Sequence, residues 1–297
     1  MGLIGNNTRW FFILPSSQEA EERHIYDIAF GIKCLLSKGI DYSSISVLID
    51  YASTSKIEAV FSKMQLQTPA KIYTTDQIDE LLTGNTYKNA VVFITGHGSP
   101  EGLDTTNPIK PYSLYYRFQT TPNFKRVIIY LGQCYAGIFN QMPLSSHLGL
   151  KSEEMNKNCS IVAIGSTGLF SSISSPITVG NVRWSANIFL AYVFNWLMKP
   201  TDIDGDGCYS VMDSFKAATI YTNEALIDLK KKDNFESLLQ QSQLATCIDK
   251  LKDATIPEDE KNNLLLEIQA LEKMLQIRYI NQEPWILNAH IAMSTSF

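Results

Sequence analysis

The strongest constraint on the fold of this chain is a repeated order of short apolar run, turn rich in glycine, serine or proline, and segment of helical periodicity. The runs cover residues 10–14, 45–49, 90–95, 127–131 and 160–164. Continuous apolar runs of this length are typical of strands buried on both faces, as in parallel sheets covered by helices. The repeated order therefore predicts an α/β fold, a three-layer αβα sandwich with a mostly parallel central sheet.

Helical spacing of apolar residues fills the segments between these runs and then the rest of the chain. It predicts helices over residues 18–37, 55–64, 76–82, 111–118, 187–198, 211–232, 235–252 and 257–278. The last two each carry one apolar stripe, so we expect a helical hairpin. The stripes fit packing within the protein, and they also fit a regulatory arm that docks a partner protein. The expected division is an α/β domain over 1–232, the hairpin over 233–280, and a tail over 281–297 that returns to the first domain.

The composition argues against two classes of partner. The net charge is -5, whereas nucleic-acid binding needs a basic surface that releases counterions. No apolar run approaches the length of about 20 residues that a membrane-spanning helix needs. The five cysteines include no C-x-x-C pair, so neither a disulfide framework nor a thiolate metal site is indicated. We therefore expect a cytoplasmic protein that binds neither nucleic acid nor membranes.

Reactive residue types follow three of the predicted strands at their carboxyl ends. His97, Cys134 and Ser166 each lie in a glycine-rich turn after an apolar run. Ligand sites of open α/β sheets gather at the carboxyl ends of the strands, so these residues are expected on one rim. His97 and Cys134 are separated by one crossover, which makes their strands expected neighbours. A histidine next to a cysteine can take the thiol proton and so create a nucleophile.

The alternative for each residue alone is structural, because a cysteine after a strand is often a small core residue and His-Gly is often a turn. Cys34 and Cys247 lie within predicted helices among apolar neighbours, which is typical of core residues. His24 lies on a predicted helix beside charged residues, and His147 and His290 follow no apolar run. The joint position of Cys134 and His97 favours a catalytic dyad.

Two sequence blocks carry a family resemblance. Residues 90–99 read AVVFITGHGS and residues 127–137 read VIIYLGQCYAG. They resemble the His-Gly and Cys-x-Ser-Gly blocks of the caspase-like (clan CD) cysteine peptidases, and are nearest in motif to legumain-like and metacaspase-like bacterial members. The resemblance covers about residues 8–225 and implies a caspase-like sandwich.

The resemblance also implies roles for individual residues. Cys134 would attack the scissile carbonyl, His97 would protonate the leaving amine, and the N–H groups of Gly98 and Cys134 would form the oxyanion hole. Gly132 stands where metacaspases carry an aspartate that recognises basic side chains, so the preferred side chain stays open. By analogy, a substrate pocket would draw on the ends of the first and fifth strands and on the residue before the nucleophile, namely Ser16, Gln133, Ser166, Ser171 and Ser172.

An acidic segment over residues 202–213 matches the pattern of a calcium-binding loop. Its candidate ligands are Asp202, Asp204, Asp206, Cys208, Ser210 and Asp213, with Gly207 at the turn position. The alternative is an acidic turn in which Asp206 or Ser210 caps the next helix. If an ion binds, a structural calcium ion is expected rather than a switch, and the dyad chemistry itself needs no cofactor.

These observations predict a cysteine endopeptidase that acts on protein or peptide substrates and is kept inactive until a partner, a cleavage or an ion orders its loops. Two alternatives stay open. One is a catalytically silent caspase-like scaffold whose hairpin docks a partner. The other is a calcium-responsive partner-binding protein.

Overall fold

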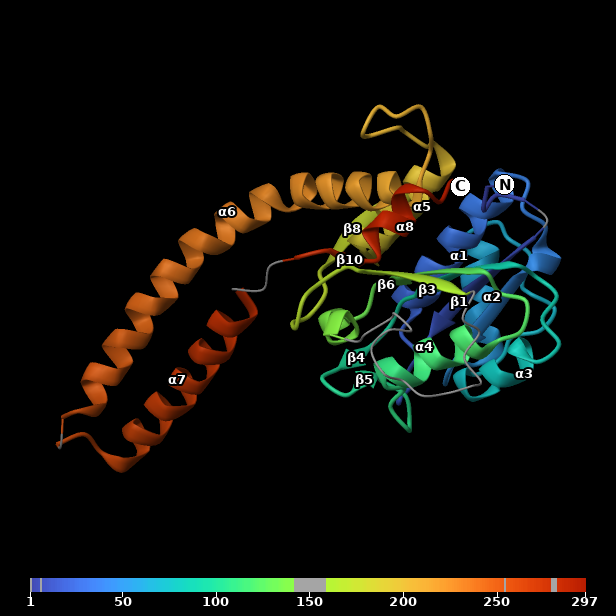
Figure 1. Ribbon diagram of the computed structural model, residues 1–297. Helices are drawn as coiled ribbons and strands as arrows, with labels where there is room; N and C mark the ends of the chain where they lie inside the picture. Colours follow the sequence, from blue (N-terminus) through green and yellow to red (C-terminus); the bar gives the residue numbers. More distant parts are fainter. Residues whose placement is uncertain (1, 6, 142–158, 254, 279–281) are drawn as a thin grey trace. The chain divides into compact units, whose positions relative to one another are not determined.

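The computed structural model describes residues 2–5, 7–141, 159–253, 255–278 and 282–297 (Figure 1). The chain divides into two compact units, Met1–Thr222 with Gln282–Phe297, and Asn223–Asn281. The expected boundary was residue 232, and the observed one falls ten residues earlier, inside a helix. The last residues belong to the first unit, which is where the returning tail was expected.

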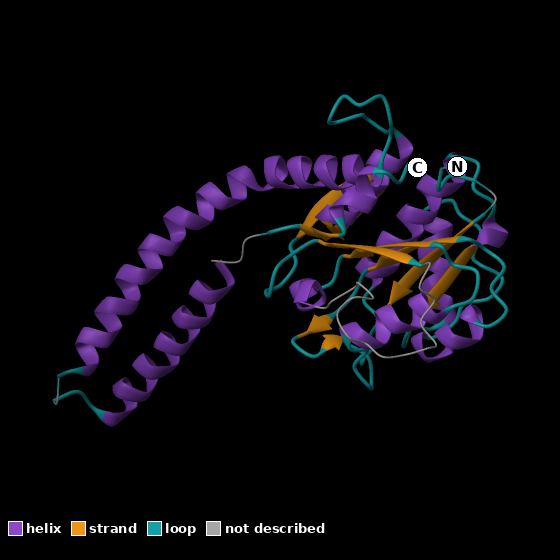
Figure 2. Cartoon of the chain, viewed as in Figure 1, coloured by secondary structure: helices purple, strands orange, loops and turns teal. Residues whose placement is uncertain are grey.

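A six-stranded sheet forms the centre of the first unit, and each predicted apolar run lies in one of its strands (Figure 2). The strands are arranged in the order β10-β7-β6-β3-β1-β2, and all neighbours are parallel except the pair of β10 and β7. Their bounds are Thr8–Leu14 (β1), Ile45–Ile49 (β2), Asn89–Ile94 (β3), Arg126–Leu131 (β6), Ser160–Gly165 (β7) and Trp285–Leu287 (β10). The predicted α/β class with a mostly parallel sheet is therefore confirmed.

Two apolar clusters, one on each face of the sheet, make the unit a three-layer structure. Successive residues of β1 alternate between them, with Trp10, Phe12 and Leu14 in one cluster and Phe11 and Ile13 in the other. This alternation is what a strand buried on both faces requires. The first cluster is covered by α1 (Glu22–Ser37), α2 (Thr54–Lys63), α5 (Ile188–Met198) and the start of α6, and the second by α3 (Ile78–Leu82), α4 (Pro111–Thr120) and the 3-10 turn Ala136–Gln141.

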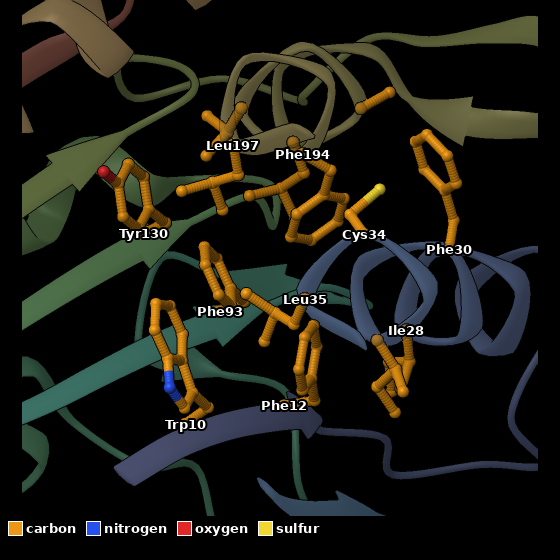
Figure 3. Packing of buried hydrophobic residues seen from close by; sticks show 14 of the residues in the cluster. Trp10, Phe12, Ile28, Phe30, Cys34, Leu35, Phe93, Tyr130, Phe194 and Leu197 are labelled. Carbon is orange, nitrogen blue, oxygen red and sulfur yellow. The ribbon is translucent and has the colours of Figure 1, made fainter. Parts of the chain in front are cut away.

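Aromatic side chains fill the first cluster (Figure 3). Phe93 of β3 lies at its centre, 5.2 Å from the Tyr130 ring in a stacked arrangement and 5.0 Å from the Phe194 ring edge to face. Phe12 adds a third contact, with its centroid 5.2 Å from that of Phe93. Such pairs stabilise the core by about 0.5–1.5 kcal/mol each beyond area burial. They fix β3 and β6, the strands that precede His97 and Cys134.

Several short elements were not predicted. They are the strand pairs β4 (Gly98–Ser99) with β5 (Gly102–Leu103) and β8 (Ser174–Val179) with β9 (Val182–Asn187), the helix α8 (Ala289–Met293), and 3-10 turns at Tyr42–Ser44 and Thr75–Gln77. Strand β10 was also unforeseen, and it pairs with β7 at one edge of the sheet. An edge strand that is paired no longer offers free backbone groups to another chain.

The predicted break between residues 232 and 235 is wrong, because α6 (Val211–Leu251) is one continuous helix. No glycine or proline lies at this point, and an aspartate followed by an asparagine costs a helix too little to end it. In the second unit, α6 and α7 (Glu258–Arg278) share a small core of Cys247, Leu264 and Leu271, so the expected hairpin packs on itself. Among the described residues, no helix combines the length and apolar character needed to cross a membrane.

Candidate active site

The carboxyl ends of β3, β6 and β7 lie side by side, as the sequence predicted. Ile94 pairs with Leu131 in the parallel ladder of β3 and β6, and the Gly132 N–H continues it by donating to the Ile94 carbonyl at 2.8 Å. On the other side, the Ser166 N–H donates to the Leu131 carbonyl at 2.9 Å. The turns that carry His97, Cys134 and Ser166 therefore start from one rim.

The His97 and Cys134 turns are in direct backbone contact at Gly98. A Cβ built on Gly98 would overlap the Cys134 carbonyl oxygen and lie 2.6 Å from Cγ of Gln133. Only a residue without a side chain allows this approach. Gly98 therefore brings the turn after His97 against the nucleophile candidate.

Hydrogen bonds to the segment after β7 hold the Cys134 turn. The Tyr135 N–H donates to the Phe170 carbonyl at 2.7 Å, and the Gly137 N–H donates to the Gly168 carbonyl at 2.9 Å. Tyr135 adopts a left-handed φ of 55°, which is uncommon for a residue with a side chain and is typical of functional turns. The Ser172 N–H also donates to Sγ of Cys134 at 3.3 Å. The sulfur thus lies against a polar N–H donor on the neighbouring loop.

Two N–H groups of the His97 and Cys134 turns donate to no backbone acceptor in the described part of the chain. The Asp104 N–H donates to the His97 carbonyl at 3.2 Å, so Gly98 and Leu103 form a pair that shares no ladder hydrogen bond. The Gly98 N–H is therefore not used by the β4–β5 pair. The Cys134 N–H donates to no acceptor within the described part of the chain. These are the two groups that the family resemblance assigns to an oxyanion hole.

His97 is oriented by an acidic residue that the sequence reasoning missed. Nε2 of His97 lies 2.9 Å from Oε1 of Glu21, which is the N-cap residue of α1. Glu21 also accepts from Nε of Arg23 at 2.6 Å, and this hydrogen bond is the main reason that its pKa is lowered to about 2. The His97 side chain is 40% exposed, so it can be reached from solvent.

A second histidine, His24 of α1, lies next to His97 on its buried side. The two rings meet edge to face with centroids 5.3 Å apart. Nδ1 of His24 lies 3.1 Å from Oγ1 of Thr95, and that hydroxyl donates to Oδ2 of Asp27 at 3.0 Å. Sequence reasoning set His24 aside as a helix histidine. The available signal was the i, i+3 spacing of His24 and Asp27, which places an imidazole and a carboxylate on one helix face.

The predicted pocket residues fall into two groups. Ser172 contacts Cys134, Oγ of Ser166 donates to the Gly132 carbonyl at 3.2 Å, and Gln133 is fully buried with both side-chain amide atoms unpartnered. Ser171 lies half-buried in the same loop. Ser16 instead donates its N–H to Asp50.

That Ser16–Asp50 contact, at 3.3 Å, borders a separate cavity of about 240 Å³ at the ends of β1 and β2. Thr75 contributes two more hydrogen bonds to the Asp50 carboxylate. Burial nevertheless raises the Asp50 pKa. Four of the five predicted pocket residues therefore lie in the turns around Cys134, and the fifth, Ser16, lies at a separate cavity that is also lined by Asp50 and Asp76.

The remaining cysteines differ from Cys134 in their surroundings. Burial raises the pKa of both Cys34 and Cys159 to about 12, so neither thiol ionises near neutral pH. Cys247 is buried in the hairpin core, and Cys208 is exposed in the acidic loop. His147, one of the alternatives to His97, lies outside the described residues.

The acidic loop forms part of the expected calcium site and also the capping turn that was its alternative. Carboxylate oxygens of Asp202, Asp204 and Asp206 lie within 4.8 Å of one another. Asp213, however, accepts from the backbone N–H groups of Ser210 and Ile203, and the Asp213 N–H donates back to Oγ of Ser210 at 3.1 Å. This reciprocal pair is a capping box at the start of α6. Three acidic side chains fit a calcium ion, while Asp213 already serves the helix and Cys208 offers a soft sulfur that calcium does not favour.

A comparison with protein-family models and with curated protein sequences found no match to this chain.

Proposed function

We propose that this protein is a cysteine endopeptidase in which Cys134 is the nucleophile and His97 is the acid and base partner. The observation that carries the proposal is the contact between the two turns at Gly98, where the N–H groups of Gly98 and Cys134 donate to no backbone acceptor in the described part of the chain. A buried structural cysteine would need neither feature. The sequence resemblance to caspase-like peptidases supports the same residues in the same roles.

The proposed reaction has two stages. His97 takes the proton of the Cys134 thiol, Sγ forms a bond to the carbonyl carbon of the scissile peptide, and the electron pair of the carbonyl moves to oxygen. The N–H groups of Gly98 and Cys134 stabilise this oxyanion. The C–N bond then breaks as His97 gives a proton to the leaving nitrogen, which produces a thioester. In the second stage, His97 takes a proton from water and the resulting hydroxide attacks the thioester carbonyl. The C–S bond then breaks, the acyl part leaves as a carboxylic acid, and the Cys134 sulfur takes a proton back from His97.

Glu21 has a positioning role in this proposal. Its carboxylate accepts from Nε2 of His97 at 2.9 Å and so fixes which nitrogen of the ring carries a proton in the resting state. The same contact stabilises the imidazolium that forms when the thiol ionises. The second nitrogen, Nδ1, is then the one that exchanges a proton with Cys134 or with the substrate.

The substrate we propose is an extended segment of a protein or peptide. An extended chain can pair its backbone with a sheet edge near the rim, a mode of binding that leaves side chains to select the sequence. The segment around Cys134 carries the neutral polar residues Ser172, which contacts Sγ, and Ser166 and Gln133, which are fully buried. This lining fits a neutral or polar side chain better than a charged one, because an unpaired charge is costly to bury.

Regulation by a partner protein is a further prediction, and the exposed apolar side chains of the hairpin support it. Leu238, Leu239 and Leu266 are each more than half exposed on α6 and α7. Exposed apolar groups of this size are typical of contact surfaces. The catalytically silent scaffold is the second candidate function, and the presence of both His97 and Cys134 on the rim favours the enzyme over it.

The test is reaction with a peptide-like thiol-reactive probe, followed by mass spectrometry of the labelled residue. Wild-type protein should be labelled at Cys134, and Cys134→Ala and His97→Ala should lose the reaction. Cys208→Ala is the matched control because Cys208 is the exposed cysteine of the acidic loop. Full labelling of Cys134→Ala would refute the proposal. A library of cleavable peptides then tests the expected neutral preference.

A further inference from the structure

His24 presents a buried nitrogen lone pair that has no partner. The hydroxyl of Thr95 gives its proton to Asp27, so it can only accept from Nδ1 of His24. Nδ1 therefore carries the ring proton and Nε2 carries the lone pair. The residue is 4% exposed, and Nε2 has no hydrogen-bond partner. A buried acceptor of this kind needs a donor or an ion to offset its loss of water.

Two further metal-binding groups lie beside the His24 ring. One nitrogen of His24, one nitrogen of His97 and one carboxylate oxygen of Glu21 all lie within 4.8 Å of one another. Two imidazoles and a carboxylate are a ligand set typical of zinc sites that keep a fourth position for water. The relay from His24 through Thr95 to Asp27 supplies the second-shell hydrogen bond that fixes the tautomer of a metal-binding histidine.

We propose that Glu21, His24 and His97 bind a divalent transition metal ion, Zn²⁺ above all, and that the bound ion switches off the dyad. The inhibition rests on the proposed peptidase function, whereas the binding does not. The dyad needs an imidazole that can carry protons on both nitrogens. An ion on one nitrogen of His97 removes that state, whichever nitrogen faces Cys134.

The three side chains need to move only slightly to bind an ion. Bonds of about 2.1 Å in a tetrahedral arrangement separate ligand atoms by about 3.4 Å. Nε2 of His97 and Oε1 of Glu21 are already 2.9 Å apart. Both of these side chains are well exposed and can adjust, while the rigid buried His24 sets the position of the ion.

Two features weaken the site and make its affinity tunable. The Arg23 guanidinium shares the Glu21 carboxylate at 2.6 Å and 3.3 Å, and it competes with a cation for that ligand. The N-terminal end of α1 also disfavours positive charge. Replacing Arg23 with glutamine should therefore tighten zinc binding. Cys134 does not belong to the cluster, which separates this site from the thiolate–zinc contact open to any cysteine peptidase.

The binding test uses the full chain carrying Cys134→Ser and titration calorimetry with Zn²⁺ alone. Adding His24→Gln or Glu21→Gln should weaken zinc binding at least about tenfold, the lower end of the loss seen even for second-shell changes. Asp206→Asn in the acidic loop is the control and should leave this site unchanged. Glu21 is exposed, so Glu21→Gln keeps the test decisive if His24→Gln unfolds. Undiminished binding by a folded His24→Gln or Glu21→Gln variant, or loss of binding through Cys134→Ser itself, would overturn the site.

Probe labelling of wild-type protein with and without Zn²⁺ tests the inhibition separately. Labelling should fall in zinc and return on chelation, and zinc should have little effect in His24→Gln. If zinc at concentrations that saturate the site leaves labelling unchanged, the proposed inhibition of the dyad by zinc is overturned. If no condition gives labelling while calorimetry still depends on His24, the peptidase proposal fails and the metal site stands.

Discussion

Replacing Gly98 with alanine tests the contact on which the proposed active site depends. The Gly98 φ lies outside the left-handed region, so alanine meets no backbone penalty there, and the effect comes from the added methyl group alone. That methyl would overlap the Cys134 carbonyl oxygen and lie 2.6 Å from Cγ of Gln133. An ordinary contact starts at 3.4 Å, so the two turns must separate by at least 0.8 Å, from 2.6 Å to 3.4 Å.

A shift of this size acts on chemistry more than on stability. Misplacement of reacting groups by about 1 Å costs about 10²-fold in rate, and loss of one oxyanion donor costs about 10²–10³-fold. Overpacking of the rim costs about 1–3 kcal/mol of unfolding free energy. We therefore expect urea denaturation to show that Gly98→Ala is folded in the absence of urea. The variant should react with the peptide-like probe about 100 times more slowly than the wild type.

Gly168→Ala is the matched control for this measurement. Gly168 lies in the neighbouring turn, and its added Cβ would meet one atom, Oε2 of Glu283, at a relaxed 3.7 Å. Its labelling rate should equal that of the wild type. A Gly98→Ala variant that labels at the wild-type rate would show that the Gly98 contact does not position the site.

Four other measurements follow from the structure. The Glu21 pKa is about 2 in the folded protein rather than 4.5, so the stabilisation by the Glu21 carboxylate is present above pH 4.5 and is lost as pH falls toward 2. The melting temperature of wild type should therefore exceed that of Glu21→Gln at neutral pH, and this difference should shrink between pH 4.5 and 2. The difference should be small, because the carboxylate is half-exposed. Ser210→Ala removes the capping box of α6 and should lower the free energy of unfolding in urea by about 1 kcal/mol. An unchanged urea midpoint would contradict the cap. If the acidic loop binds calcium, saturation to 100 times Kd should stabilise wild type by about 2.7 kcal/mol but not Asp204→Asn, and equal melting with and without calcium excludes the ion. Asp27→Asn places an amide N–H group opposite the buried donors that Asp27 now accepts from, and it should lower the free energy of unfolding in urea by about 2–3 kcal/mol. Asp249 is exposed, so Asp249→Asn is the control and should leave the free energy of unfolding unchanged.

The sheet was predictable because its strands are buried on both faces and so read as uninterrupted apolar runs. Strands β8 and β9 escaped because β8 alternates between exposed and half-buried residues, contains Pro176, and pairs with β9 alone. Strand β10 is three residues long and pairs with β7 from the far end of the chain. Such a segment carries too little local periodicity to be recognised.

The position of His97 and Cys134 on one rim was predictable and the surroundings of His97 were not, for a related reason. Cys134 and His97 each end a strand, so strand order alone brings them to one rim. Glu21 and His24 reach His97 from the start of α1, and no period or spacing in the sequence encodes which side of the helix faces that turn. Gly98 was recognised as a glycine, while its contact with Cys134 required the register of β3 against β6.

A buried carboxylate ties both halves of the candidate site to the core. Asp27 accepts from Thr95 at the end of β3, from Trp184 at 2.9 Å, and from the Asn187 N–H at 3.3 Å. The Asn187 side chain in turn donates to the Gly132 carbonyl, two residues before Cys134.

This network runs from the His97 side to the Cys134 side without passing through either reactive group. Satisfied buried polar networks rigidify and specify one arrangement. Thr95 lies two residues before His97, and Gly132 lies two residues before Cys134. The distance between the two turns is therefore set by hydrogen bonds inside the protein and not by the side chains of His97 and Cys134.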